Sequence, residues 1–255
     1  MKQVKKFISN KYLMFLYGTI FVILLWWIVS LCVQSVIVPS PLETIKLAGK
    51  YLTEAYTYKS IGYSLLRLLI GFGIAFLIAF LLGIIVNNNE KLYHFFTPLM
   101  TFFKSIPTAA LVFLFIIAVG AEDSSILAVI ILAIPILYEA VVGGLKNVPK
   151  EMIDSAKIDG ANKIKRVLRI QLPNSYSYIA IGLLSAFSLS FKIEIMAEVI
   201  SGSTRNGLGS LIKGAQINDP TDLTPIFAYS FIAVVLMLLI TIAVYFINQK
   251  IKEKR

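Results

Sequence analysis

Apolar residues in this chain come in long runs, rather than in the alternation of a half-buried strand or the one-sided stripe of a surface helix. A helix needs about twenty apolar residues to cross the hydrocarbon core of a bilayer. Six segments meet this requirement, namely residues 13–33, 64–86, 98–120, 126–145, 176–200 and 225–247. The pattern predicts an all-α polytopic membrane protein of about six transmembrane helices, forming a single domain over residues 1–255.

Composition agrees with lipid as the surrounding solvent. Hydrophobic residues make up 58% of the 255 residues and the mean hydropathy is +0.81, whereas soluble domains are about 45–50% apolar. The net charge of +10 would favour nucleic acid in a soluble protein. Here the basic residues lie mostly between apolar runs, so we expect contact with anionic lipid headgroups and no nucleic-acid partner.

The distribution of Lys and Arg predicts the orientation of the helices. With the N-terminus inside, seventeen basic residues fall on inner segments and five on outer ones. Both termini and the segment 146–175 are therefore predicted to be cytoplasmic. The basic N-terminal stretch resembles a signal peptide, but the apolar run after it exceeds the usual core of about 7–15 residues. We expect that run to be retained as the first helix.

Few residues could carry catalysis or bind a metal. The chain has one cysteine, Cys32, and one histidine, His94, so it cannot form an internal disulfide or a Cys/His metal set. A phosphate-binding loop needs the pattern GxxxxGK[ST]. The glycine-rich stretch 202–209 lacks the Lys-Ser/Thr pair and is interpreted as a flexible external loop. We expect no catalytic residue, no metal site and no cofactor in this chain.

The hydrophilic segment 146–175 carries helix signals. Pro149 suits a first helical turn, and acids at Glu151 and Asp154 suit the positive end of a helix dipole. Gly160 can take the positive φ that ends a helix. A first short helix is therefore predicted before Gly160.

A second, basic helix is predicted over residues 161–172, after which Pro173 restarts the chain into the fifth span. Links between packed helices are usually about 2–8 residues long, and this one is far longer. We expect such a loop to bind a partner; a solvated connector is the alternative.

The same segment resembles the EAA loop of bacterial ABC importer permeases. That pattern is Glu-Ala-Ala, three residues, Gly, nine residues and Ile-x-Leu-Pro, and this chain fits the spacing without gaps. Asp154 replaces Glu and Ser155 replaces the first Ala, changes that keep charge or size. The expected coupling residues are Asp154, Ser155, Ala156, Gly160, Ala161, Ile170, Leu172 and Pro173.

Four further stretches are similar to permeases of the nitrate, sulfonate, taurine and thiamine-precursor branch: Val38-Pro39-Ser40-Pro41, Lys104-Ser105-Ile106-Pro107, Ala197-Glu198 and Asn206-Gly207-Leu208-Gly209. The resemblance covers about residues 36–250. It implies a type I ABC importer permease fold in the bacterial plasma (inner) membrane. It also implies a small solute as substrate: a sulfonate, a nitrate-like anion or a thiamine-precursor-like molecule.

The resemblance implies partners as well. In that family the loop inserts a coupling helix into a groove on a separate ATPase subunit, which binds ATP and Mg. Two ATPase subunits and an extracytoplasmic solute-binding protein are expected. One chain offers one docking loop, so a homodimer of permeases is the economical arrangement. The small side chain of Ala156 is expected to let the ATPase approach the backbone closely.

Charged residues within the fifth span are candidates for the translocation path or a gate. Lys192, Glu194 and Glu198 lie toward its outer end, where charge is costly unless it is paired or faces water. Glu194 and Glu198 are four residues apart and share a helix face. Two ionised carboxylates would repel each other there, so a proton, a cation or a basic neighbour is expected. The alternative is that the span ends early, which places all three at the interface.

Other intramembrane features have simpler interpretations. Arg67 and Glu139, near the ends of their spans, are interpreted as interfacial residues. Pro107 and Pro135 interrupt two spans and are expected to kink or break them. Small residues at Gly71, Ala75 and Ala79, spaced four apart, are expected to allow close helix packing.

Two other classes of protein are possible. A secondary transporter or channel would show inverted repeats or several ionisable residues at the midplane. No repeat stands out, and there is one charged cluster. A membrane-embedded enzyme would need a nucleophile and a base, for which a single loop histidine offers little.

Overall fold

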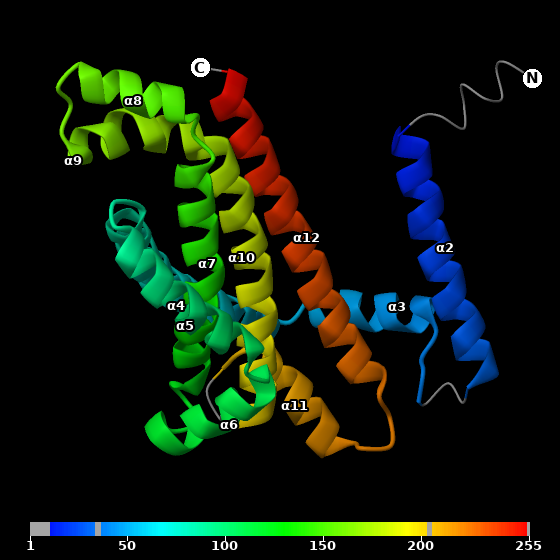
Figure 1. Ribbon diagram of the computed structural model, residues 1–255. Coiled ribbons are helices and arrows are strands. Elements are labelled where there is room, and N and C mark those ends of the chain that lie inside the picture. Colours follow the sequence, from blue (N-terminus) through cyan, green and yellow to red (C-terminus); the bar gives the residue numbers. More distant parts are fainter. Residues whose placement is uncertain (1–10, 34–36, 203–205, 254–255) are drawn as a thin grey trace, which may run out of the picture. The chain divides into compact units, whose positions relative to one another are not determined.

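The computed structural model describes residues 11–33, 37–202 and 206–253 (Figure 1). Within those ranges the regular structure is helical and contains no strand, which confirms the predicted all-α class. The chain divides into two compact units. The smaller unit comprises the described parts of residues 1–58 together with 211–234, and the larger comprises 59–210 with the described part of 235–255.

The smaller unit is built on α2 (Lys11–Cys32), α3 (Pro41–Tyr51), most of α11 (Leu208–Asn218) and the first part of α12 (Thr224–Glu253). The segment 38–41 forms the joint between its first two helices. Ser40 caps α3 by accepting from the backbone N–H of Glu43, whose side chain accepts from the backbone N–H of Ser40 at 3.0 Å. Pro41 occupies the first turn, where its missing N–H costs nothing. The bonds from Ser40 lower the pKa of Glu43.

Aromatic residues hold the smaller unit together. The indole N–H of Trp26 donates to the carbonyl of Pro39 at 3.1 Å, and its ring stacks on Phe227. The rings of Tyr51 and Tyr229 stack with their centroids 4.3 Å apart. These contacts join α2 and α3 to the first part of α12 within the smaller unit.

The larger unit contains most of α4 and the following helices up to the start of α11. Their bounds are α4 (Ala55–Asn87), α5 (Glu90–Ser105), α6 (Thr108–Val119), α7 (Ser124–Lys146), α8 (Lys150–Ile158), α9 (Lys163–Arg166), the π-helical η1 (Val167–Gln171) and α10 (Leu172–Ser201). Helices α7 and α10 pack along each other at its centre, as Figure 1 shows. Leu137, Val141 and Leu145 of α7 are completely buried there.

Four helical stretches among the described residues are long and apolar enough to cross a membrane: Ala55–Asn87, Ser124–Lys146, Lys163–Ser201 and Thr224–Ala243. The pair α5 and α6 could form a fifth, broken span. In α2, a shorter apolar stretch runs over Leu16–Cys32. The structure therefore confirms a multi-span protein, and the number of six crossings stays a prediction.

The predicted third span, residues 98–120, is broken at Pro107, as the sequence led us to expect. Helices α5 and α6 meet at an angle of 93°. Ile106 is extended, with ψ of 131°, and Pro107 follows it. Proline disfavours helical geometry in the residue before it and lacks the N–H that would continue the helix. Pro135, in contrast, lies inside an unbroken α7.

The predicted restart of the chain at Pro173 is wrong. Helical structure continues from Lys163 to Ser201. The backbone N–H of Leu172 donates to the carbonyl of Val167, five residues earlier, so the hydrogen-bond register shifts just before the proline. A π turn of this kind lets a helix accommodate a residue without an N–H.

Small residues bring α4 against α7, as the spacing of four predicts. Ala75 and Ala79 are fully buried. A Cβ atom built on Gly71 would lie 2.9 Å from Cγ1 of Val129. No larger side chain would fit there without displacing α7.

Candidate functional site

The hydrophilic segment between α7 and α10 folds as a sharp helical elbow. We define the elbow as residues 150–171. Helix α8 ends at Ile158 and Gly160 takes φ of +77°, a conformation that favours glycine. The backbone N–H of Ala161 then donates to the carbonyl of Ala156 at 2.9 Å, which closes the turn. The predicted glycine turn between two short helices is therefore present.

The far side of the turn is fixed by a capping residue. The side chain of Asn162 accepts from the backbone N–H of Lys165 at 2.8 Å and begins α9. Figure 1 shows α8 and α9 running beside each other near the ends of α7 and α10. The elbow is therefore an ordered structure supported by the two central helices, which makes a loose connector a poor description of it.

Large apolar side chains are exposed on this elbow. Ile158 is 86% exposed and Ile164 is 67% exposed. Leu168 and Met152 are exposed as well. Apolar side chains gathered on an otherwise charged surface are typical of a protein-binding site.

The small side chain of Ala156 packs inside the elbow. It is 6% exposed and faces the interior, where α8 contacts α9 and η1. Its small size allows the two arms of the elbow to pack, and the close approach of an ATPase to its backbone stays a prediction. Asp154 and Ser155, by contrast, are exposed.

Of the remaining expected coupling residues, Ala161 lies in the turn, and Ile170, Leu172 and Pro173 lie around the base of the elbow. Ala161, Ile170 and Leu172 are half-buried, and Pro173 is exposed. The structure thus places all eight expected residues in or beside the elbow, with Asp154, Ser155, Gly160 and Pro173 at its surface.

A second site lies at the other end of α10, around Glu198. This carboxylate is 1% exposed. Nη1 of Arg67 lies 2.5 Å from its Oε1, and Oγ of Ser64 lies 2.8 Å from both of its oxygens. The backbone N–H of Gly209 donates to Oε2 at 2.8 Å. Both oxygens of Glu198 are therefore satisfied within the larger unit.

The segment 206–209 wraps around the same carboxylate. The second nitrogen of Arg67, Nη2, donates to the carbonyl of Asn206 at 2.9 Å, and the backbone N–H of Leu208 donates to Oγ of Ser64 at 2.8 Å. The N–H of Gly209, in the first turn of α11, points toward the negative charge, an arrangement favoured by the helix dipole. We call these groups, namely Ser64, Arg67, Glu198 and the backbone of residues 206–209, the Glu198 cluster.

Both glycines of this segment are required because Glu198 packs against them too closely to leave room for a Cβ atom. A Cβ atom on Gly207 would lie 2.8 Å from Oε2 of Glu198, and one on Gly209 would lie 2.5 Å from Cβ of Glu198. The interpretation of residues 202–209 as a flexible external loop is therefore wrong for 206–209. Residues 203–205 lie outside the described part of the chain.

The three charged residues of the fifth span do not act as one group. Glu194 is fully buried and its Oε1 accepts from Oγ of Ser125 at 2.9 Å, whereas its Oε2 has no partner among the described residues. Lys192 points away from these carboxylates and is exposed. The shared helix face predicted for Glu194 and Glu198 is observed, and the basic neighbour of Glu198 is Arg67.

The interfacial assignment of Arg67 is wrong. Arg67 is 7% exposed and both of its terminal nitrogens are bound within the larger unit. Sequence reasoning missed Ser64 and Ser125, which are partners of the two glutamates. The signal available for Ser64 was its spacing of three from Arg67, which places both on one face of α4.

A second ion pair lies where α5 ends. Lys104 Nζ lies 2.7 Å from a carboxylate oxygen of Glu139, and both side chains are nearly half exposed. The pair joins the end of α5 to α7, next to the bend at Pro107. The interfacial position predicted for Glu139 agrees with this exposure.

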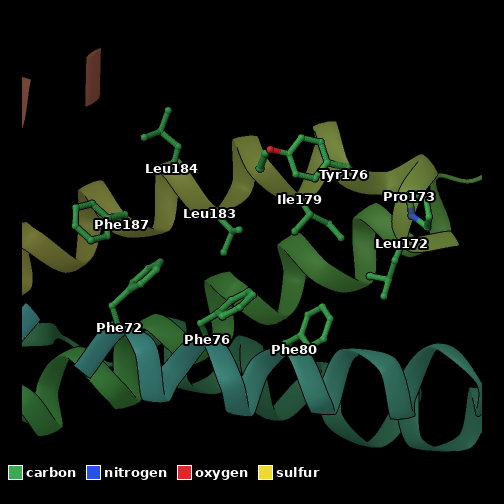
Figure 2. Close-up of a pocket in the computed structure, with 11 residues that line it drawn as sticks. Phe72, Phe76, Phe80, Leu172, Pro173, Tyr176, Ile179, Leu183, Leu184 and Phe187 are labelled. Atoms are coloured by element: carbon green, nitrogen blue, oxygen red, sulfur yellow. The ribbon is translucent and has the colours of Figure 1, made fainter. Parts of the chain in front are cut away.

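A pocket of about 590 Å³ opens between α4 and α10, and Figure 2 shows its lining. Phe72, Phe76 and Phe80 project into it from α4, opposite Tyr176 and Phe187 of α10. No charged side chain lines it. It could accept an apolar group or a helix face, and it offers no cation to hold an anion. The described residues include no group of three His, Cys, Asp or Glu side chains placed to hold a metal ion.

Comparison with known proteins gives a consistent result. The profile of the family described as "binding-protein-dependent transport system inner membrane component" matches residues 63–254. A probable ABC transporter permease protein of Brucella melitensis biotype 1 is 25% identical over 196 residues, covering 75% of this chain and 77% of that protein. A nitrate import permease protein of Synechocystis is 26% identical over 202 residues, covering 75% and 72% respectively.

The fold has a counterpart among solved structures. An inward-facing methionine ABC transporter chain superimposes with a TM-score of 0.67 at 19% sequence identity, over 76% of this chain and 94% of that chain. At this identity the likeness concerns the fold alone.

Proposed function

This chain belongs to the family of binding-protein-dependent transport system inner membrane components, as a multi-pass, non-catalytic ABC importer permease subunit of the bacterial inner membrane, and from that premise we propose that it passes a small anion across the membrane. The anion would be delivered by an extracytoplasmic binding protein. Separate ATPase subunits, which bind ATP and Mg, would drive its passage. The whole chain is proposed to act as one permease domain.

The choice of substrate class rests on the relatives. The Synechocystis relative is named as a nitrate importer. A nitrate-like anion is therefore the proposed substrate, with a sulfonate or a thiamine-precursor-like molecule as alternatives from the same branch of permeases. The aromatic pocket carries no charge, so selection of an anion is assigned to the binding protein.

The elbow is the proposed docking element for the ATPase. The single observation that carries this proposal is an ordered turn that exposes Ile158 at its tip, next to a glycine with positive φ. An ATPase groove would bury Ile158, Ile164 and Leu168, and movement of the ATPase would pull on α7 and α10 through the base of the elbow. One elbow per chain and two ATPases per transporter favour a second copy of this chain as partner.

The outer end of α10 is proposed to act as a gate. Glu194 and Glu198 are buried in this conformation and face no open path. They could hold the outer end of α10 against α4 and α7 until a conformational change separates these helices. Lys192, being exposed, is the member of the trio that could face a path or the second copy.

Docking can be tested by substitutions at the elbow with matched controls elsewhere. Ile158→Asp places a charge at the exposed tip, and Ile217→Asp makes the same change at an exposed isoleucine of α11. Gly160→Trp adds bulk at a positive-φ glycine, and Gly120→Trp does so at another with φ of +86°. A Cβ atom meets nothing within 4 Å at either glycine.

The measurement is co-purification of the ATPase with each membrane-inserted variant, followed by ATP-dependent uptake of nitrate. We expect Ile158→Asp and Gly160→Trp to lose the ATPase and uptake, while Ile217→Asp and Gly120→Trp keep the ATPase. If Ile158→Asp and Gly160→Trp still co-purify with the ATPase and still support ATP-dependent uptake, the docking role is refuted.

A further inference from the structure

Basic side chains converge on a separate pocket at the base of the elbow. Its volume is about 330 Å³. Four cationic side chains line it together with three polar amides: Lys146, Lys150, Lys163, Arg166, Asn87, Asn88 and Gln171. None of the lining residues is acidic. Four cations around one cavity repel one another unless an anion occupies it, so the pocket is built for negative charge.

Several of these groups are held in place by the fold. Nζ of Lys146 lies 3.0 Å from the centroid of the Tyr93 ring, a contact that fixes this cation. The side-chain amide of Asn87 donates to Oε1 of Gln171 at 2.9 Å, and Gln171 is 6% exposed. The remaining polar group of Gln171 is its NH₂, a donor. Donors therefore join the cations around the cavity.

The pocket also lies at a defined place along the helices. Asn87 ends α4 and Lys146 ends α7, while Gln171 immediately precedes α10. All three helices are among the stretches able to cross a membrane. Where such helices end, the apolar core of a bilayer gives way to its phosphate layer.

We propose that this pocket, which we call the basic pocket, binds a phosphate group, carried either by an anionic phospholipid or by a free phosphate ion. Phosphate presents several acceptor oxygens and at least one negative charge, which suits an arginine fork, three lysines and amide donors. Its oxygens point in several directions, so they can reach more of the surrounding donors than the two oxygens of a planar carboxylate. The proposal concerns a site distinct from the exposed apolar tip of the elbow and does not require that the ATPase dock there.

The test compares two triple variants that remove the same charge from the same elbow. The pocket variant is Lys150→Ala, Lys163→Ala and Arg166→Ala. The control variant is Lys157→Ala, Lys165→Ala and Arg169→Ala, three exposed cations that do not line the basic pocket. Lys146 is kept in both, because it packs on Tyr93. The single variant Lys150→Ala is included because it changes one exposed residue and leaves the packing of the elbow intact.

Binding of phosphatidylglycerol, phosphatidylcholine and inorganic phosphate to the purified full chain is measured by native mass spectrometry and by thermal unfolding in an uncharged detergent. We expect the pocket variant to lose about tenfold in affinity for the phosphate-bearing anionic ligand. We expect the control variant to change by less than about twofold, and Lys150→Ala to fall between them. Phosphatidylcholine, whose net charge is zero, is expected to bind without dependence on the pocket residues.

The arms of the experiment separate the two sources of phosphate. If the pocket variant loses affinity for phosphatidylglycerol alone, the site binds a lipid headgroup. If it loses stabilisation by inorganic phosphate alone, the site binds the free ion. Equal losses in the pocket and control variants would overturn the proposal, since they would show diffuse attraction to a basic surface. Neither measurement uses ATP or transported solute, so failure here leaves the proposed transport function untouched.

Discussion

Charged side chains near the two ends of α10 lie in opposite environments. At the Glu198 cluster, one carboxylate is surrounded by a guanidinium, a hydroxyl and a backbone N–H of the same chain, and both charged groups of the cluster are buried. At the elbow, the cations are exposed or line an open pocket, and Ile158 is 86% exposed. The Glu198 cluster is satisfied by groups of the same chain, whereas the elbow exposes apolar and cationic side chains, which suits its proposed role as a docking element.

Both ends carry stretches that resemble the same permease family, and the structure shows that such stretches serve two different physical purposes. Residues 206–209 close a buried polar site, so their glycines are explained by contacts inside the chain. Gly160 has nothing near its missing side chain, and its value lies in the backbone turn that exposes Ile158. Substitutions at the first end should therefore act on stability, and substitutions at the second should act on assembly.

The largest effect is expected when the buried ion pair loses one partner. Arg67→Met leaves Glu198 charged and buried, which costs about 3–5 kcal/mol of unfolding free energy. We expect a large loss of stability in denaturation of the purified chain followed by circular dichroism. Adding Glu198→Gln to Arg67→Met should recover part of it, because the neutral side chain keeps an acceptor for the N–H of Gly209. An Arg67→Met variant as stable as the parent would show that the ion pair contributes nothing.

A smaller effect is expected at the glycines that enclose Glu198. Gly207→Ala and Gly209→Ala each force a methyl group against that residue, and overpacking of this kind costs about 1–3 kcal/mol. Gly214→Ala is the matched control, because a Cβ atom there meets nothing within 4 Å and alanine favours a helix. Gly214→Ala should be neutral or slightly stabilising in the same assay. A ranking in which Gly214→Ala is the most damaging of the three would contradict the close packing around Glu198.

Sequence alone was sufficient for the fold class because lipid imposes a simple rule. Helices that cross a bilayer must be long and apolar, and the runs around α4, α7, α10 and α12 show this directly. The importer permease fold followed from the resemblance, and the family match and the structural likeness confirm it. The glycine turn at Gly160 was also predictable, since few residues tolerate its positive φ.

Contacts between segments far apart in the chain could not be predicted from the sequence. Arg67 and Glu198 are 131 positions apart, and hydrophobicity does not show which faces of two spans meet. Arg67 therefore looked like an interfacial residue. The packing of Ala156 inside the elbow was missed for a related reason, because a small side chain in an exposed loop suits either an approaching partner or internal packing. The prolines show a third limit: a kink or break was expected at both Pro107 and Pro135, whereas the helix breaks at Pro107 and α7 continues through Pro135.

The smallest effect is expected at the ion pair between Lys104 and Glu139, which has the chemistry of the Glu198 pair without its burial. The side chains are 43% and 49% exposed. Ion pairs of this exposure contribute about 0.2–1 kcal/mol and are screened by salt. In a double-mutant cycle with Lys104→Ala and Glu139→Ala, we expect a coupling of about 0.5 kcal/mol at low ionic strength that vanishes at high ionic strength.

The corresponding cycle for Arg67 and Glu198 should give a larger coupling that salt does not change, because water and ions do not reach a carboxylate that is 1% exposed. If both couplings respond to salt alike, then the contrast between a closed end and an open end of this chain does not hold for its charges.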